Sequence, residues 1–176
     1  MVLVTAQSRQ SLKLLSIEHM QVKPGEYYFR ITSLLKQTNA SGGRHRNPQP
    51  VIFKKYDHDK SLCVFPLLEE YIASTIKLRG SCSQLLLCHF KPNGPALKDT
   101  ISRWPKQVMT AAGLDTSIFK PHSTRSAATS AAKVAHVPLG EIMATASWRS
   151  SCLFAVFHNK PVSSDKSFAS SVLGKA

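Results

Sequence analysis

The sequence predicts a mostly helical α+β domain with a small antiparallel β-hairpin sheet. Three observations support this fold class. Apolar residues recur at helical spacing over most of the chain, two short strand-like runs flank a polar loop, and several helical segments follow the strands in one block. The chain has 176 residues, 43% of them hydrophobic, so it is long enough to bury one core of its own.

The N-terminal part contains one predicted helix and both predicted strands. Apolar spacing fits a helix over residues 5–20, and residues 22–26, with their Pro-Gly pair, mark a turn. Residues 27–31 and 51–53 are rich in aromatic and β-branched side chains, which favour strands. Together they predict an antiparallel hairpin over residues 26–54, with or without a third strand, whose tip is polar and basic.

The remainder of the chain is predicted to be mainly helical. The apolar run at residues 84–88 fits either a buried strand or an extended connection. After Pro161 the Ser, Asp, Lys and Gly content predicts a disordered tail at residues 163–176, which leaves residues 1–162 as the domain. Apolar spacing, proline near helix starts and a glycine stop at Gly113 predict helices over residues 63–78, 98–112, 123–135, 138–146 and 150–158.

The charge balance indicates a polyanionic partner. Lys and Arg number 23 against 10 Asp and Glu, a formal net charge of +13, and nucleic acid is the first candidate for such a surface. A chain that is merely basic for solubility, or an unselected gene fragment, stays open on composition alone. No membrane partner is expected, because the sequence has neither a basic amphipathic helix with a bulky apolar face nor a run of about 20 apolar residues.

The four cysteines predict neither disulfides nor a metal site. They are Cys63, Cys82, Cys88 and Cys152, and no two of them form a CxxC pair. The stretch over residues 82–89 has a weak metal-like spacing of Cys and His, but apolar thiols around a buried strand explain it better. We therefore expect reduced thiols in an intracellular protein, no metal and no cofactor.

The strongest chemical signal is the string PHSTRSAATSAAKVAHVPLGEIMATASW, followed by FAVFHNKP. His122 and Arg125 are three residues apart at the start of a predicted helix, so their side chains share one face. A guanidinium gives a phosphate two parallel hydrogen bonds, an imidazole adds a proton donor, and a helix N-terminus favours an anion. The pattern predicts a phosphodiester site, although HxxR alone also fits a surface His and Arg with no role.

The same segment resembles the signature of the tyrosine recombinases, the phage-integrase family. In that family HxxR opens a helix, a His or Trp follows, and the nucleophilic tyrosine comes after it. Trp148 stands 23 residues after Arg125, in the place of the family's His or Trp, and His158 stands ten residues later, in the place of the tyrosine. The string from Phe154 to Pro161 is similar to F-x-x-F-Y-x-K-P of the eukaryotic Crypton and DIRS mobile-element recombinases, with His158 replacing the tyrosine.

The resemblance extends toward the N-terminus and covers about residues 5–162. The family's catalytic lysine lies in a β-hairpin, and Lys36 is its best match. The family's first arginine lies in a helix of pattern T-x-Q-R-x-x-x-L, which TAQSRQSL matches with Ser8 in the arginine position. Arg9 is one residue away, a helical rotation of about 100°, so it is not expected to point where the family arginine points. The early part of the family's catalytic domain and its core-binding domain have no counterpart, so the domain is expected to be truncated.

The resemblance implies double-stranded DNA as the partner and DNA breaking and rejoining as the family's activity. The catalytic positions implied for this chain are His122, Arg125, Trp148 and Lys36, with His158 at the position of the nucleophile. We expect impaired cleavage, because losing the nucleophile deletes the covalent route, whereas DNA binding survives better. The residues expected to contact the DNA backbone are Lys36, Arg44, Arg103, Lys106, His122 and Arg125.

Three function hypotheses stay open on the sequence. They are a recombinase-derived DNA-binding module, an active recombinase completed in trans by a partner's tyrosine, and a non-functional fragment of a decayed mobile element. A plain RNA-binding protein is disfavoured because RNP-type aromatic strings are absent. The resemblance implies the nucleus as the location in a eukaryote and the cytoplasm otherwise, with a second copy or a related recombinase as a partner on DNA.

Overall fold

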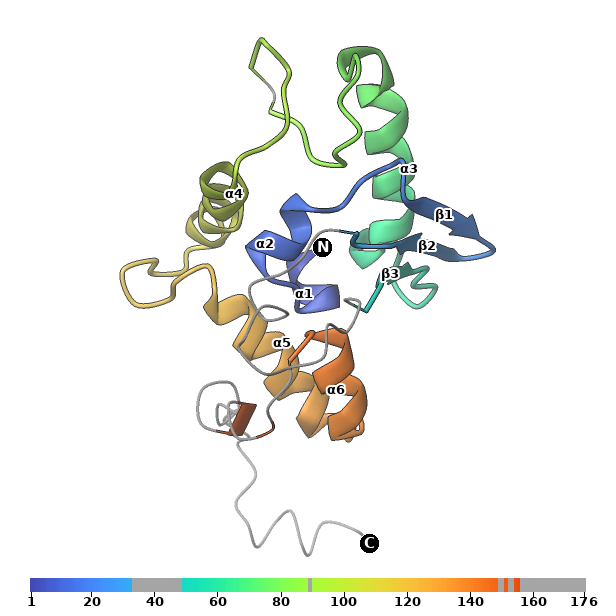
Figure 1. Cartoon of the computed structure of the whole chain (residues 1–176). Coiled ribbons are helices and arrows are strands. Elements are labelled where there is room, and N and C mark those ends of the chain that lie inside the picture. The colour runs from blue at the N-terminus through green and yellow to red at the C-terminus, as the bar shows by residue number, and fades with distance from the viewer. Residues whose placement is uncertain (33–48, 89, 149–150, 152–153, 156–176) are drawn as a thin grey trace, which may run out of the picture.

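The computed structural model describes residues 1–32, 49–88, 90–148, 151 and 154–155. It confirms a mostly helical α+β arrangement with a small antiparallel sheet (Figure 1). In chain order the elements are α1 (Val2–Thr5), α2 (Arg9–Lys13), β1 (Met20–Lys23), β2 (Glu26–Phe29), β3 (Val51–Lys54), the 3-10 turn η2 (Lys60–Leu62), α3 (Val64–Thr75), the 3-10 turn η3 (Ile76–Leu78), α4 (Lys98–Ala111), α5 (Ser123–Val134) and α6 (Leu139–Thr145).

The sheet has three antiparallel strands in the order β1-β2-β3. Alternation along the strands buries Tyr27 and Phe29 of β2 with Val51 and Phe53 of β3, and the rings of Phe29 and Phe53 meet edge to face with centroids 5.8 Å apart. Helix α3 packs against β3, and its Phe65 ring lies 4.6 Å from that of Tyr27. The predicted hairpin is therefore confirmed, with β1 as a third strand.

The N-terminal segment differs from the single helix predicted over residues 5–20. Ala6 adopts a left-handed backbone with φ 48°, which ends α1, and Ser8 then caps α2 by accepting a hydrogen bond from the Ser11 amide. Met20–Lys23 pairs with β2 as a strand and does not continue the helix. Strand pairing is a tertiary contact, and here it overrides the local helical spacing.

Arg79 anchors the end of the α3 region to the extended segment that follows it. The side chain is buried, and its guanidinium donates to the carbonyl oxygens of Gln84 and Leu85 and, at 2.7 Å, to the Thr75 hydroxyl. Leu85 is fully buried in the core. Residues 84–88 form only isolated bridges, so of the two predicted alternatives they are an extended connection.

Helices α1 and α2 lie at the centre of the molecule, between the sheet and α4, with α5 and α6 below them in Figure 1. Helix α1 contacts α5 and β3, α2 contacts α4, and α5 contacts α6. Helices α3 to α6 lie close to their predicted bounds, and the predicted stop at Gly113 has φ 76°, which glycine adopts without strain. The helix predicted over residues 150–158 and the predicted tail fall largely or wholly outside the described residues.

In the described part of the chain, no helix combines the length and the apolar character that crossing a bilayer requires.

Candidate functional site

A small pocket of about 200 Å³ opens where α2, α4 and α5 meet. Segments far apart in the sequence form its walls: the chain around α2, the middle of α4 and the first turn of α5. Among the described residues that line it there are two guanidinium groups and one imidazole but no carboxylate, a combination that favours an anion. Its polar lining consists of Gln7, Ser8, Arg9, Ser102, His122, Thr124 and Arg125.

Helix α5 places His122 and Arg125 together on this pocket. His122 is the N-cap residue of the helix and Arg125 lies in its first turn. Between them, the Thr124 hydroxyl donates to the Pro121 carbonyl at 2.7 Å, which fixes the start of the helix. The N–H groups of a first helical turn carry a partial positive charge, so the helix adds to the attraction of an anion here.

Arg125 is held between α5 and the end of α6. Its Nη2 donates to the Ala146 carbonyl, and its guanidinium lies 4.6 Å from the centre of the Trp148 ring. Burial lowers the pKa of the guanidinium to about 10, so it still carries its charge at neutral pH. Its Nε is buried without a hydrogen-bond partner in the described part of the chain. An anion bound in the pocket would offset this partly unsatisfied buried charge.

Trp148 follows a sharp corner at the end of α6. Ser147 has a left-handed backbone with φ 54°, and the Trp148 amide donates back to the Met143 carbonyl at 2.9 Å, which closes the corner. The Trp148 ring lies next to both the Arg125 guanidinium and the Phe154 ring, whose centroid is 5.5 Å away. The structure therefore brings Trp148 next to Arg125.

Gln7 ties the N-terminal segment to the same corner. Its side chain is buried, at 4% exposure, and its Nε2 donates to the Thr145 carbonyl at 2.5 Å and to the Ser147 hydroxyl at 3.3 Å. The sequence analysis did not identify Gln7 as a site residue. Its partners lie 138 and 140 residues away along the chain, and no local pattern reports such a contact.

Arg9 lines the pocket that also contains His122 and Arg125. Its Nη1 donates to the Ser102 hydroxyl on α4 at 2.6 Å. The expected helical rotation between Ser8 and Arg9 does not apply, because Ser8 has an extended backbone with ψ 157° and the helix begins only at Arg9. The sequence prediction assumed one helix through both residues, whereas the helix of the structure begins at Arg9.

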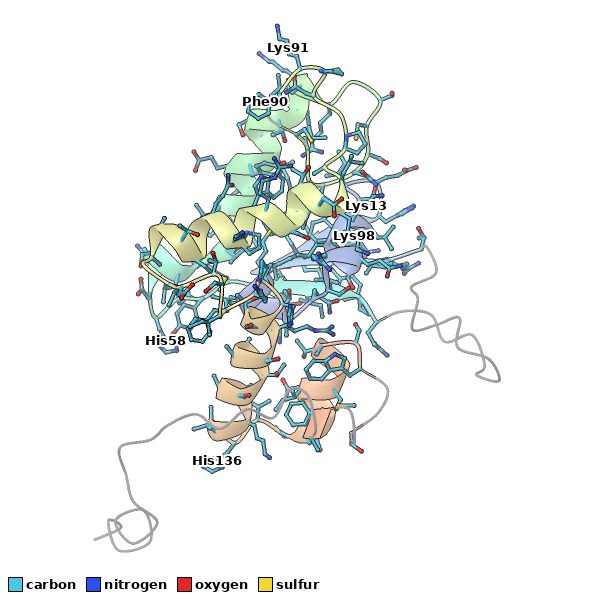
Figure 2. The ribbon with its side chains drawn as sticks, turned by 90° about the vertical axis from the view of Figure 1, so that its left-hand side faces the viewer. Lys13, His58, Phe90, Lys91, Lys98 and His136 are labelled. Carbon is cyan, nitrogen blue, oxygen red and sulfur yellow. The ribbon has the colours of Figure 1, made fainter. Side chains whose placement is uncertain are left out.

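Further basic side chains lie on α2 and α4, outside the lining of the pocket. Lys13, at the end of α2, and Lys98, at the start of α4, lie on one side of the molecule (Figure 2). The predicted DNA-contacting residues Arg103 and Lys106 are exposed on α4 and do not line the pocket. Both ion pairs found among the described residues are near the end of β3, so neither neutralises the basic groups of α2 and α4.

Three predicted site residues, Lys36, Arg44 and His158, lie outside the described residues. Within the part that is described, no group of three or more His, Cys, Asp or Glu side chains is placed to hold a metal ion. The cysteines there are free thiols, namely Cys63, Cys82 and Cys88.

A larger groove of about 700 Å³ lies between α1, β3, α5 and α6. Its rim includes the exposed apolar side chains of Leu3, Val4 and Leu62. Gln7 lines this groove as well as the small pocket, so its side chain lies in the wall between them. Among the described residues that line the groove there is no cluster like His122 and Arg125, so the small pocket is the candidate site.

No protein-family model matches the sequence, and no curated protein matches it. Solved recombinase structures are similar to this chain. The XerH site-specific recombinase bound to palindromic difH substrate, a post-cleavage complex, has a TM-score of 0.59 at 17% identity, over 85% of this chain and 37% of that chain. Its pre-cleavage complex with difH substrate gives 0.61 at 15% identity, over 85% and 38%. The XerA recombinase gives 0.65 at 16% identity, over 91% and 51%.

These likenesses establish the fold. The chain has a tyrosine-recombinase fold, as the sequence predicts. It spans between 37% and 51% of the length of these recombinases. At identities of 15% to 17%, the arrangement of the elements is shared, and the function has to be argued from the pocket itself.

Proposed function

We propose that this chain is a DNA-binding domain derived from a tyrosine recombinase and impaired in strand cleavage. The observation that carries the proposal is the pocket in which Arg9, His122 and Arg125 meet, with no carboxylate among its described lining residues. The recombinase fold and the net charge of +13 support it.

One phosphate of a DNA duplex is the ligand that fits this pocket. Arg125 offers charged N–H donors from a plane that Trp148 supports, and His122 adds a donor at the start of α5. Arg9 brings a second guanidinium from α2. Lys13 and Lys98, which lie on one side of the molecule, would then meet neighbouring phosphates. Such contacts position a protein on DNA without reading its sequence.

Impaired cleavage follows from the residue at the nucleophile's position. Tyrosine recombinases cut by attack of a tyrosine on the phosphodiester, and this chain has His158 at the matching place in its sequence. From the resemblance of FAVFHNKP to the Crypton and DIRS pattern, we further propose an origin in a eukaryotic mobile element and a nuclear location. A second copy or a related recombinase is the partner we propose on DNA.

Binding of a short labelled DNA duplex, followed by fluorescence anisotropy, tests the pocket. Arg125→Gln should weaken binding about ten- to a hundredfold, because a hydrogen bond to a charged group contributes about 1.5–3 kcal/mol. His122→Ala should weaken it less. Arg30→Gln and His136→Ala are matched controls, since both residues are exposed and outside the pocket. Equal losses in Arg125→Gln and Arg30→Gln would refute the assignment of the phosphate to this pocket.

A suicide substrate that traps covalent protein–DNA adducts tests the impairment. The chain should yield no more adduct than a His158→Ala variant. Robust adducts that disappear in His158→Ala would overturn the proposal that strand cleavage is impaired. Adducts that form only after mixing with a recombinase that carries the tyrosine would instead support the hypothesis of completion in trans.

A further inference from the structure

We propose that Gln7 is a positioning residue, which holds Arg125 and Trp148 in the arrangement that binds the phosphate. The inference rests on the proposed function of the pocket and adds a residue that acts through others. Gln7 reaches the site from the opposite end of the sequence, with partners 138 and 140 residues away.

The orientation of the Gln7 amide is fixed by its partner. A backbone carbonyl only accepts hydrogen bonds, so the Nε2 group has to face the Thr145 carbonyl, 2.5 Å away. The Oε1 atom is buried and has no hydrogen-bond partner among the described residues. A buried amide whose nitrogen is hydrogen-bonded but whose oxygen is not lowers the stability of the fold. What Gln7 contributes is therefore its donor contact to the corner at residues 145–147.

Gln7 and Arg125 hold two consecutive carbonyls of that corner. Gln7 donates to Thr145, and Arg125 donates to Ala146. Ser147 then turns the backbone through the left-handed region, which non-glycine residues adopt only when their surroundings hold them there. The next residue is Trp148, whose ring supports the Arg125 guanidinium. Loosening the corner would therefore move the carbonyl and the ring that together orient Arg125.

If the Gln7 amide had only a structural role, it would join the N-terminal segment to the corner at residues 145–147 without affecting the pocket. Two observations favour positioning. Gln7 itself lines the pocket, next in sequence to Ser8 and Arg9. Its acceptors also lie within three residues of Trp148, in the same turn that Arg125 holds.

Three variants separate these roles. Gln7→Ala removes the donor, and Gln7→Glu keeps the shape but replaces the donor with a carboxylate that only accepts when ionised. Gln10→Ala is the matched control, because Gln10 is the same residue type three positions on, half-buried, and lines neither the pocket nor the groove.

The first readout needs no DNA. The chain has two tryptophans, so a Trp104→Phe background leaves Trp148 as the reporter. Acrylamide should quench Trp148 fluorescence more strongly in Gln7→Ala than in Gln10→Ala, at a temperature where circular dichroism shows both variants folded. Equal quenching in the two variants would overturn the proposal.

The second readout is affinity for the labelled duplex. Gln7→Ala should bind about three- to tenfold more weakly than the parent chain, the effect expected of one buried hydrogen bond. Gln7→Glu should lose more at neutral pH and recover relative to the parent as the pH falls, because a protonated carboxyl again donates to Thr145. A Gln7→Ala variant that melts earlier but binds like the parent would show a structural role only. A parent chain that fails to bind DNA would refute the proposed function, while the quenching comparison would still decide the role of Gln7.

Discussion

Ser8 and Arg9 show how the start of a helix decides what a side chain can reach. The Ser8 hydroxyl accepts from the Ser11 amide, so this side chain is used to cap α2. Arg9 is the first residue of the helix and extends toward α4, where Ser102 accepts its hydrogen bond at 2.6 Å. The Ser102 hydroxyl in turn donates to the Lys98 carbonyl. Guanidinium groups thus approach the pocket from both α2 and α5.

We expect the Arg9 side chain to contribute directly to DNA binding. Arg9→Gln should lower affinity for a duplex about tenfold. It should also flatten the dependence of log affinity on log salt by about 0.9, the effect of one lost phosphate contact. Salt titrations of Arg9→Gln and of the exposed control Arg30→Gln provide the comparison. Identical slopes in both variants would mean that Arg9 does not touch a phosphate.

From the residue pattern alone, without the resemblance, the candidate site was predictable only where its geometry is local. His122 and Arg125 share a helix face because they are three residues apart, and the spacing alone shows this. The resemblance to the recombinase signature added Trp148 as a site residue, and its contact with Arg125 is seen only in the structure. The contacts of Gln7 with Thr145 and of Arg9 with Ser102 join distant segments, so no short pattern contains them.

Among the elements, periodic helices were predicted well and the N-terminal segment was not. Helices α4 and α5 have clear apolar spacing and recognisable ends, so their bounds were close to those observed. The helix predicted over residues 5–20 was wrong in extent, because Ala6 breaks it and Met20–Lys23 pairs with β2. Both events depend on contacts with the rest of the molecule, and propensity does not include them.

The connection after α3 yields a stability prediction. Arg79→Ala should lower the free energy of unfolding by about 2–4 kcal/mol, because the carbonyls of Gln84 and Leu85 lose their donor in a buried setting. Urea unfolding followed by circular dichroism measures the change. Arg103→Ala, at an exposed position of α4, should change it by less than about 0.5 kcal/mol. A similarly small effect of Arg79→Ala would show that this anchor is dispensable.

Because the whole molecule is positively charged, the dependence of its DNA affinity on salt concentration is the most informative measurement. Arg9 of α2 lines the pocket and Arg103 and Lys106 are exposed on α4, while the ion pairs of the described residues lie near β3. If about five phosphates are contacted, log affinity should fall against log salt with a slope of about −4.5. Anisotropy titrations over a range of KCl concentrations measure this slope. Affinity that does not change with salt would argue against a phosphate-based interface.

The pocket and the corner that supports it join segments far apart in the chain, and this has a consequence for the order in which they form during synthesis. Residues 7–9 leave the ribosome before the corner at residues 145–148, which emerges more than a hundred residues later. Contacts of such long range form late in folding. A nascent chain that ends after α4 would lack His122, Arg125 and Trp148, and Gln7 would have no acceptor. The pocket therefore forms only after the first turn of α5 has been synthesised, and Gln7 finds its acceptors only once residues 145–147 follow.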